Sequence, residues 1–443
     1  MKRALALLVF SVFSSSAAAQ GEPSMPILFT NVHVFDGVNE QRIENANVVV
    51  TGNLISEVSA EPLAVANARI VDGGGRTLMP GLIEHHWHAM FAGATLLTIL
   101  SRQDGYVNLV AAREAEATLL RGFTTVRDLG GNVFSLKAAI DEGLFPGPRI
   151  YPSGPLIGQT SGHSDFRPQN EHPLGPAAPL TIPERSGHMI IADGVPQVLM
   201  RVREALKMGA SQIKIMAGGG TASHWDPIDV SQYTFDELKA AVDAAAAWNT
   251  YVAVHAYTPA AIRASIEAGV KVIEHGNLID EEIATLMAEN DVWLSIQPFL
   301  LSEEWMLFSD PVSRAKQEVV FRGTDVSMEL ALKHGVKIVW GTDMILMPEL
   351  AERQGYMLTL MSKWYEPWEV LKLATSNAAE LFKLSGPRNP YPNAALGVIA
   401  EGAYADLILV DGNPLEDLDL IADPDRYFDL IMKDGQIYKN TLE

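Results

Sequence analysis

The chain has 443 residues, a formal net charge of −21, 48% hydrophobic and 20% charged residues, and no cysteine. These values exclude a disordered chain, and the length allows several domains or one large α/β barrel with an attachment. The absence of cysteine excludes disulfide scaffolds, thiolate metal sites and cysteine nucleophiles. The acidic balance argues against nucleic acid or anionic lipid as partners, because phosphate binding needs clustered Lys and Arg.

The first residues have the pattern of a secretory signal peptide. Lys2 and Arg3 give a positive start, residues 4–13 are apolar, and small residues follow up to Ala19. The apolar run is too short for a membrane span of about 20 residues, so cleavage after Ala19 is favoured over a buried N-terminal helix. We therefore expect residues 1–19 to be removed and the mature protein to be exported, periplasmic or extracellular, and not bound to a membrane.

Regions at both ends of the mature chain have the pattern of short strands joined by turns. Apolar, mostly β-branched residues alternate with polar ones within residues 27–80 and again within residues 397–439. Neither region has enough strands for a core of its own. The sequence therefore predicts one small β-sandwich domain built from residues 20–80 and 386–443.

Between these ends, apolar strand-like runs alternate with segments of helical periodicity. The runs are residues 78–88, 122–130, 149–158, 212–220, 251–257, 271–276, 292–300 and 337–344. Helical patterns separate most of them, as at residues 109–120, 198–208 and 238–248, and a capping box at residues 234–237 precedes the third. This alternation predicts a (β/α)8 TIM-type barrel over residues 81–385, with a doubly wound open sheet as the alternative.

One connection in the predicted barrel is longer than such loops usually are. Residues 158–191 hold several Gly and Pro residues and show little periodicity. Long loops in compact folds are mostly lids or binding loops, so we expect one here.

Polar residues stand at the ends of several predicted strands, where the active site of such a barrel lies. The group comprises four histidines, a lysine and an aspartate: His86, His88, His255, His275, Lys214 and Asp343. Each has an ordinary structural explanation on its own, but chance does not readily place all of them on one face. Imidazole and carboxylate donors without thiolate suit zinc or a similar divalent metal. The sequence therefore predicts a metal site at the mouth of the barrel.

Lys214 is the informative member of this group, because an ammonium cannot bind a metal and is repelled by one. A buried lysine has a lowered pKa and can act as a neutral nucleophile. Its reaction with CO₂ would give a carbamate, an anionic ligand with two oxygens that is able to bridge two metal ions. A structural lysine beside a site for one metal is the alternative.

Several segments together resemble the metal-dependent amidohydrolase superfamily over nearly all of the mature chain. They are PGLIEHHWH at residues 80–88, GFTTVRD at 122–128, GTD at 341–343, TSNAA at 375–379 and the stretch 397–414. Glu84 stands where the family usually has Asp. Two further segments, GASQIKI at residues 209–215 and TSGHSD at 160–165, resemble the branch with a carboxylated lysine, which includes Xaa-Pro dipeptidases, related carboxypeptidase-like dipeptidases and ochratoxin-hydrolysing amidohydrolases.

The resemblance implies two zinc ions and a division of the ligands between them. His86, His88 and Asp343 would hold one ion, His255 and His275 the other, and Lys214, as N6-carboxylysine, would bridge both. In such a site a metal-bridging hydroxide attacks the substrate carbonyl. Asp343 takes the proton and passes it to the leaving amine.

The substrate groups are sought among residues near the expected metals. The branch releases an amino acid with a free carboxylate, which needs hydrogen-bond donors, and His163 and Tyr257 are the candidates for this role. Arg127 is a weaker candidate, because an ion pair with a carboxylate of the barrel explains it better. Apolar residues of the lid and of the loop after the seventh strand could admit an aromatic group: Phe166, Phe299, Trp305 and Phe308.

The sequence thus predicts a secreted binuclear amidohydrolase that cleaves the amide bond to a C-terminal amino acid. Dipeptides and N-acyl amino acids are the expected substrates, ochratoxin A is a further candidate, and we expect a homo-oligomer. One alternative is a mononuclear cyclic-amide hydrolase or deaminase of the imidazolonepropionase type, which has no use for a bridging carbamate. Another is a non-catalytic periplasmic metal-binding protein, which needs no base such as Asp343 beside an open position.

Overall fold

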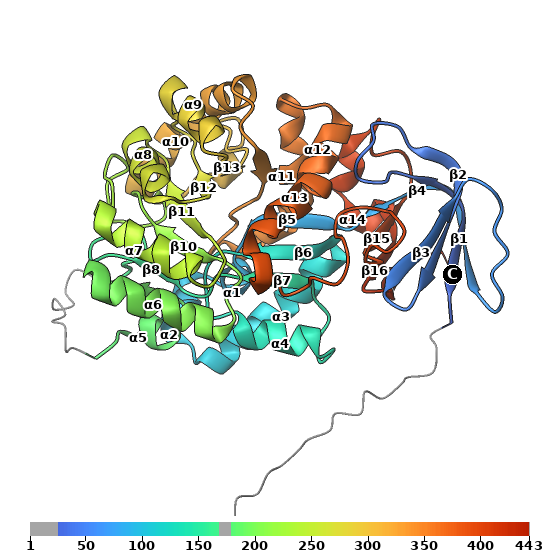
Figure 1. Ribbon diagram of the computed structural model, residues 1–443, viewed down its shortest axis with the longest axis horizontal. Coiled ribbons are helices and arrows are strands. Elements are labelled where there is room, and N and C mark those ends of the chain that lie inside the picture. Colours follow the sequence, from blue (N-terminus) through green and yellow to red (C-terminus); the bar gives the residue numbers. More distant parts are fainter. Residues whose placement is uncertain (1–24, 168–178, 443) are drawn as a thin grey trace, which may run out of the picture.

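A computed structural model describes residues 25–167 and 179–442 of the chain. The predicted signal peptide of residues 1–19 lies outside the described residues, as does the middle of the connection at residues 158–191. Within the described ranges, no helix combines the length and the apolar character needed to cross a membrane. These ranges form a body of parallel strands wrapped by helices, with a second sheet beside it (Figure 1).

Parallel strands occupy all the segments that the sequence predicts for the barrel. They are β5 (Leu82–Trp87), β6 (Phe123–Asp128), β7 (Arg149–Pro152), β10 (Ile213–Met216), β11 (Val252–Ala256), β12 (Val272–His275), β13 (Trp293–Ile296) and β14 (Ile338–Trp340). The third predicted segment divides, because its second half forms β8 (Leu156–Gly158), which pairs with β9 (Met189–Ile191) from the long connection. Every residue of the barrel strands is buried, as expected for a parallel sheet covered by helices.

These strands form two parallel sheets that meet at two seams. One sheet has the order β5-β6-β7, and the other has the order β14-β13-β12-β11-β10-β8-β9. At the first seam, the backbone N–H of Ser211 donates to the carbonyl of Pro152 at 2.8 Å. At the second seam, the backbone N–H of Asp343 donates to the backbone carbonyl of His86 at 2.9 Å. The arrangement is consistent with the predicted TIM-type barrel, and the second seam brings two predicted site residues side by side.

Helices lie around the outside of these strands (Figure 1). The α-helices are α1 (Ala89–Ala92), α2 (Leu96–Ser101), α3 (Asp104–Leu120), α4 (Phe134–Asp141), α5 (Ile182–Arg185), α6 (Gly194–Met208), α7 (Phe235–Ala246), α8 (Pro259–Ala268), α9 (Glu281–Glu289), α10 (Pro311–Lys333), α11 (Gln354–Thr359), α12 (Pro367–Leu373), α13 (Ser376–Leu381) and α14 (Pro424–Tyr427). Short 3-10 helices span Glu304–Met306, Pro348–Arg353, Leu360–Lys363, Phe382–Arg388 and Leu418–Ile421. The predicted capping box is confirmed, because the Glu237 carboxylate accepts a 2.8 Å hydrogen bond from the backbone N–H of Thr234 at the start of α7.

The second sheet combines strands from both ends of the chain. Its order is β17-β16-β15-β4-β1-β2-β3. Its strands are β1 (Ile27–Val34), β2 (Ile43–Thr51), β3 (Leu54–Ser59), β4 (Arg69–Pro80), β15 (Leu407–Val410), β16 (Phe428–Lys433) and β17 (Gln436–Asn440). Within this sheet, the described strand pairs are antiparallel except for β1 and β4, which run parallel. Both ends contribute strands as expected, but they form one hydrogen-bonded sheet, so the facing sheets of a β-sandwich are not confirmed.

The terminal sheet positions the first strand of the barrel. Strand β4 runs directly into β5 through Gly81, whose backbone N–H donates to the carbonyl of Asp406 at 2.8 Å. A Cβ atom at Gly81 would lie 2.2 Å from the Thr124 hydroxyl oxygen, so the two strands approach closely only because this residue is glycine. The predicted ligands at the end of β5 are therefore placed by contacts with both sheets.

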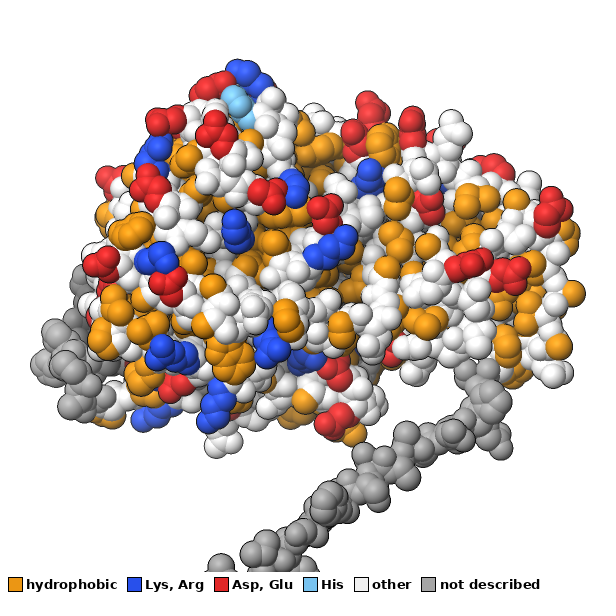
Figure 2. All heavy atoms as spheres, viewed as in Figure 1, with side chains coloured by type: hydrophobic (Ala, Val, Ile, Leu, Met, Phe, Trp, Pro, Cys, Tyr) orange, Lys and Arg blue, Asp and Glu red, His pale blue; other side chains and the backbone are white. Residues whose placement is uncertain are grey.

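The negative net charge is not spread evenly over the face that Figure 2 shows. Acidic and basic side chains are interspersed over the helices of the barrel, whereas the charged side chains visible over the terminal sheet are acidic.

A buried ion pair joins the barrel to the terminal sheet. Arg149, at the start of β7, donates to the Asp406 carboxylate at 3.0 and 3.3 Å and to Asp434 at 2.6 Å. The side chains of Arg149 and Asp406 are only 6% and 4% exposed. Removing one member of such a pair leaves an uncompensated charge in the interior.

Replacement of this arginine tests how strongly the two sheets depend on each other. We expect Arg149→Ala to lower the free energy of unfolding by about 3 kcal/mol, because the Asp406 carboxylate loses its partner. Urea denaturation followed by tryptophan fluorescence measures the change. Lys239→Ala, which removes an exposed i,i+4 pair with Asp243, is the control and should leave the midpoint unchanged. Equal midpoints for Arg149→Ala and the unaltered protein would contradict the prediction.

Candidate metal and amide-hydrolysis site

One pocket at the C-terminal ends of the barrel strands contains every residue predicted for the site. Its lining includes His86, His88, His163, Lys214, His255, Tyr257, His275 and Asp343. Because the strands are parallel, side chains far apart in the sequence meet at this end of the barrel.

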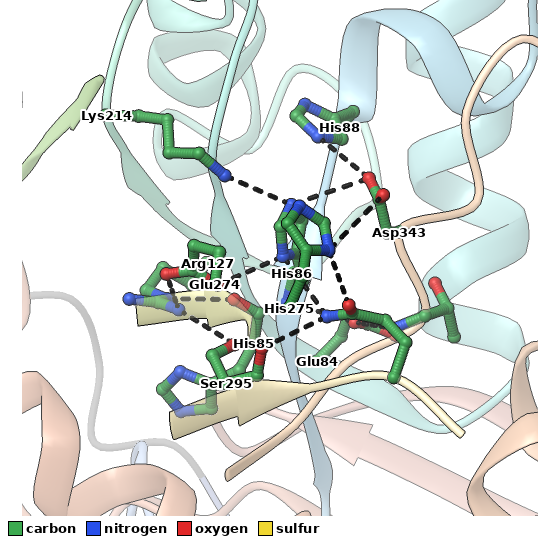
Figure 3. A network of polar contacts seen from close by, with 12 residues as sticks. Glu84, His85, His86, His88, Arg127, Lys214, Glu274, His275, Ser295 and Asp343 are labelled. Atoms are coloured by element: carbon green, nitrogen blue, oxygen red, sulfur yellow. Dashed lines mark hydrogen bonds and ion pairs between the residues drawn. The ribbon is translucent and has the colours of Figure 1, made fainter. Parts of the chain in front are cut away.

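The side chains of the first and last barrel strands converge on one point (Figure 3). The Asp343 Oδ1 atom lies 3.4 Å from His86 Nε2 and 3.3 Å from His88 Nε2, and Lys214 Nζ lies 3.3 Å from the same His86 nitrogen. Among the described residues, His86, His275 and Asp343 form a group whose ligand atoms lie within 4.8 Å of one another. A buried set of nitrogen and oxygen donors at such distances fits a divalent metal ion.

His255 and His275, the pair predicted for the second metal ion, lie side by side, but His275 is also grouped with His86 and Asp343. The rings of His255 and His275 are 4.3 Å apart, as expected for neighbouring ligands. His275 Nδ1 also lies 4.0 Å from Asp343 Oδ2, so His275 faces both halves of the site. His255 Nε2 lies 3.1 Å from the carbonyl oxygen of Gly219.

Burial sets the protonation of the histidines. It lowers the pKa values of His86, His255 and His275 well below the ordinary value. The charge of Lys214 lowers all three further, and the histidines of the site lower those of one another. The imidazoles are therefore neutral near pH 7, which is the form that binds metal ions.

Lys214 and Asp343 are shifted to the reactive forms that the predicted chemistry needs. Burial lowers the pKa of Lys214 to about 8, with Glu274 and Asp343 opposing the shift and Arg127 adding to it. Burial raises the pKa of Asp343, but His86, His88 and Lys214 outweigh this effect and leave it below its ordinary value. Near pH 7, a fraction of the Lys214 amine is thus uncharged and the Asp343 carboxylate is ionised.

Two of the predicted ligands adopt an unfavourable backbone conformation. The φ angles of His275 and Asp343 are 77° and 53°, in the left-handed region that residues other than glycine rarely occupy. Such strain persists where the surrounding structure holds a residue in place, and it concentrates at functional sites. His275 is the last residue of β12, Asp343 comes three residues after the end of β14, and both line the pocket.

A buried charged network lies beneath the ligands (Figure 3). Arg127 donates to Glu274 at 2.7 Å and to the carbonyl of His85 at 2.8 Å. The other oxygen of Glu274 lies 3.0 Å from His86 Nδ1, the ring nitrogen that points away from Asp343. Glu274 thus lies on the side of His86 where carboxylates commonly support metal-binding histidines. The expected ion pair of Arg127 with a barrel carboxylate is confirmed.

Sequence reasoning missed three supporting residues. They are Glu274, next to His275; Gln297, which accepts from His275 Nδ1 at 2.7 Å; and Glu84, which accepts from the backbone N–H groups of His86 and Thr342. Burial raises the pKa of Glu84 to about 8. Polar residues inside otherwise apolar strand runs are the signal that could have indicated them. The prediction that His85 points away from the metals is confirmed, because its ring stacks on Phe382.

The predicted substrate groups surround the same space. His163 stacks on His255 with ring centroids 4.2 Å apart, and Tyr257 is buried between His255 and His275. The predicted aromatic residues of the long connection and of the loop after β13 also line the pocket: Phe166, Phe299, Trp305 and Phe308. The lining thus combines the predicted metal ligands with apolar and aromatic side chains.

Known proteins share this fold and sequence pattern. The model of the amidohydrolase family matches residues 77–438. The ochratoxinase of Aspergillus niger is 32% identical over 421 residues, which cover 90% of this chain and 83% of that protein. A crystal structure of a prolidase complexed with N-methylphosphonate-L-proline is 37% identical, with a TM-score of 0.86 over 94% of this chain and 100% of that one. A Xaa-Pro dipeptidase structure with bound methionine is 28% identical, with a TM-score of 0.79 over 94% and 100%.

The match extends over most of the chain and includes the strands that carry the site. Family membership and the hydrolases among the similar proteins exclude the alternative of a non-catalytic metal-binding protein. The chain therefore belongs to the amidohydrolase family, and it is a metal-dependent hydrolase of amide or peptide C–N bonds.

Proposed function

We propose that this protein is an exported binuclear metal hydrolase that cleaves the amide bond to a C-terminal amino acid. The proposed substrates are dipeptides and N-acyl amino acids, and ochratoxin A is included among them. The relationship to an ochratoxinase and the likeness to prolidase structures support this choice of substrate class. Zinc is the metal proposed, since the donors are imidazole and carboxylate groups.

The environment of the Lys214 amine is the observation that carries the proposal. The side chain is 1% exposed, and its Nζ lies 3.3 Å from the nitrogen of His86 that also faces Asp343. As an ammonium it would repel a metal held by these groups. As a carbamate it would supply two anionic oxygens at the same place, and the lowered pKa favours the neutral amine from which a carbamate forms.

Asp343 is the proposed proton carrier. When bound, the metal ions polarise the substrate carbonyl and lower the pKa of water. The Asp343 carboxylate stands where the side chains of β5 and β12 meet and is ionised at neutral pH, so it can accept the proton of the attacking water. It then donates this proton to the nitrogen of the leaving amino acid.

The remaining pocket residues suit an amino-acid carboxylate and an apolar group. His163 and Tyr257 lie beside the expected ligands His255 and His275 and are the proposed contacts to the amino-acid part of the substrate, with the Tyr257 hydroxyl as the donor to its carboxylate. Among the described lining residues, Lys214 is the only lysine or arginine and Asp343 the only acidic residue. The apolar part of the lining therefore favours aromatic or aliphatic groups over charged ones.

A hydrolase with one metal ion remains the second candidate. Its support is the compact group of His86, His275 and Asp343, which would suffice for a single ion. In this case Lys214 stays an unmodified amine. Cyclic amides, rather than amides of amino acids, would then be the substrates.

A substrate panel tests the proposed reaction. It contains Ala-Pro, N-acetyl-phenylalanine, hippuryl-phenylalanine and ochratoxin A, with the C-terminal amide of each compound as its matched partner. We expect the acids to be hydrolysed with kcat/KM at least about tenfold above their amides, because the carboxylate makes charge-assisted hydrogen bonds in the pocket. Chelator-treated protein is the control for metal dependence. Cleavage of an added cyclic amide, such as hydantoin, with no hydrolysis of the panel would contradict the proposal.

Substitution of Lys214 separates the two candidates. We expect Lys214→Ala to lose bound metal and activity, with partial recovery in millimolar acetate or propionate, which replace the carbamate oxygens. Metal analysis and assay of the best panel substrate measure both. Lys207→Ala, an exposed lysine at the end of α6, is the matched control and should retain metal and activity. Full activity of Lys214→Ala would rule out the binuclear site.

A further inference from the structure

The loop after β10 builds a second polar cluster behind the pocket. It includes Ser223, Asp226 and Gln232, which are 3%, 1% and 1% exposed. None of these three residues lines the pocket itself. Their hydrogen bonds lead to one residue that does, His163.

A chain of hydrogen bonds with a defined direction ends at the His163 ring. Both oxygens of Asp226 accept hydrogen bonds: Oδ2 accepts the backbone N–H of Gly220 at 2.7 Å, and Oδ1 accepts the Ser223 hydroxyl. Because the Ser223 proton points to Asp226, the oxygen of Ser223 can only accept from His163 Nδ1, which lies 2.6 Å away. The His163 proton is therefore placed on Nδ1.

The other ring nitrogen is left for the pocket. No described residue makes a hydrogen bond to His163 Nε2, although the His163 side chain is only 14% exposed and lines the pocket. Stacking on His255 and a 2.9 Å hydrogen bond from the His163 backbone N–H to Gln232 hold the ring and its backbone in place. The orientation is thus fixed from both sides.

The backbone next to this ring has no room for a side chain. A Cβ atom at Gly220 would lie 1.8 Å from His163 Nδ1. Gly220 also donates its N–H to Asp226, so the same residue gives space to the ring and anchors the carboxylate. Lys316 of α10 fixes the loop from outside, donating to the carbonyls of Gly220, Ser223 and Asp226 at 2.9, 2.6 and 2.7 Å.

We propose that Asp226 and Ser223 are positioning residues for substrate binding: they fix the Nδ1-protonated form of His163 and aim its Nε2 atom at the substrate. The inference rests on the proposed function and refines the role of His163 in it. With its proton on Nδ1, the ring presents Nε2 as a hydrogen-bond acceptor for an N–H group of the substrate, and Tyr257 is left as the donor to the carboxylate. Asp226 and Ser223 touch neither substrate nor metal ligands, and they act through the imidazole alone. Without the Ser223 hydroxyl, the ring is free to rotate or to exchange its proton between the two nitrogens.

The first test reads the position of the proton directly and needs no substrate. Zinc-loaded protein labelled with ¹⁵N-histidine is recorded by long-range ¹H–¹⁵N correlation, and the spectrum of His163→Gln assigns the His163 signals. We expect Nδ1 of His163 to carry the proton in the unaltered protein and in Ser231→Ala, an exposed serine of the same loop. Ser223→Ala should lose this signature, and so should Gly220→Ala, whose new Cβ displaces the ring. An unchanged His163 spectrum in both variants would overturn the proposal.

The second test is a double-mutant cycle on the best substrate of the panel. We expect Ser223→Ala to raise KM about tenfold, in proportion to one lost orienting hydrogen bond, with kcat and metal content within twofold of the unaltered protein. In the His163→Ala background the same substitution should change KM less than twofold, because Ser223 then has nothing to position. Equal effects in both backgrounds would overturn the proposal. If no panel member is hydrolysed, the proposed function fails, and the proton position alone decides the role of Ser223.

Discussion

The placement of one amine, that of Lys214, constrains the whole site. It is buried, and the cost of desolvating a positive charge there outweighs the compensation that the carboxylates of Glu274 and Asp343 provide. Desolvation favours the neutral form of the amine. Its Nζ atom lies beside His86 Nε2, and therefore among the expected metal ligands. A neutral amine in this position can react with CO₂ and lose a proton to become an anionic carbamate, which is the ligand that the proposed pair of metal ions would require.

The residues around this centre determine its geometry rather than its chemistry. Glu274 reaches the far nitrogen of His86 and is itself held by Arg127. Gln297 accepts a hydrogen bond from His275 Nδ1. The Glu84 carboxylate accepts hydrogen bonds from the backbone N–H groups of His86 and Thr342, which links the first barrel strand to the segment before Asp343. The site is therefore assembled from neutral imidazoles whose orientation is set by buried partners, as preorganised metal sites need. Loop residues extend the same principle to His163, on the substrate side of the pocket.

The barrel strands and the principal site residues could be predicted from the sequence because they depend on local patterns. Runs of apolar residues mark buried parallel strands, and the side chain that follows such a run lies at the common end of the barrel, which is how Asp343 and His255 were found. The partners of these residues could not be found in this way. The contact of Arg127 with Glu274 joins residues 147 positions apart, and the grouping of His275 with His86 depends on how the barrel closes.

The terminal sheet shows the same limit. Its strands were predicted in both end regions, but hydrogen bonding joins them in one sheet whose order interleaves the two chain ends. A β-sandwich was expected because alternation indicates which residues are buried, and alternation does not say whether the covering layer is another sheet. The buried pair of Arg149 and Asp406 belongs to the contact between the two parts of the molecule, which a single sequence does not reveal.

The metal content of the protein as a function of CO₂ tests the central claim most directly. Metal-free protein is loaded with zinc in buffer with bicarbonate and in buffer purged of CO₂, and bound zinc is measured by inductively coupled plasma mass spectrometry after desalting. The account predicts two zinc ions per chain with bicarbonate and a loss of at least one without it, because the carbamate of Lys214 cannot form. One zinc ion per chain under both conditions would contradict it.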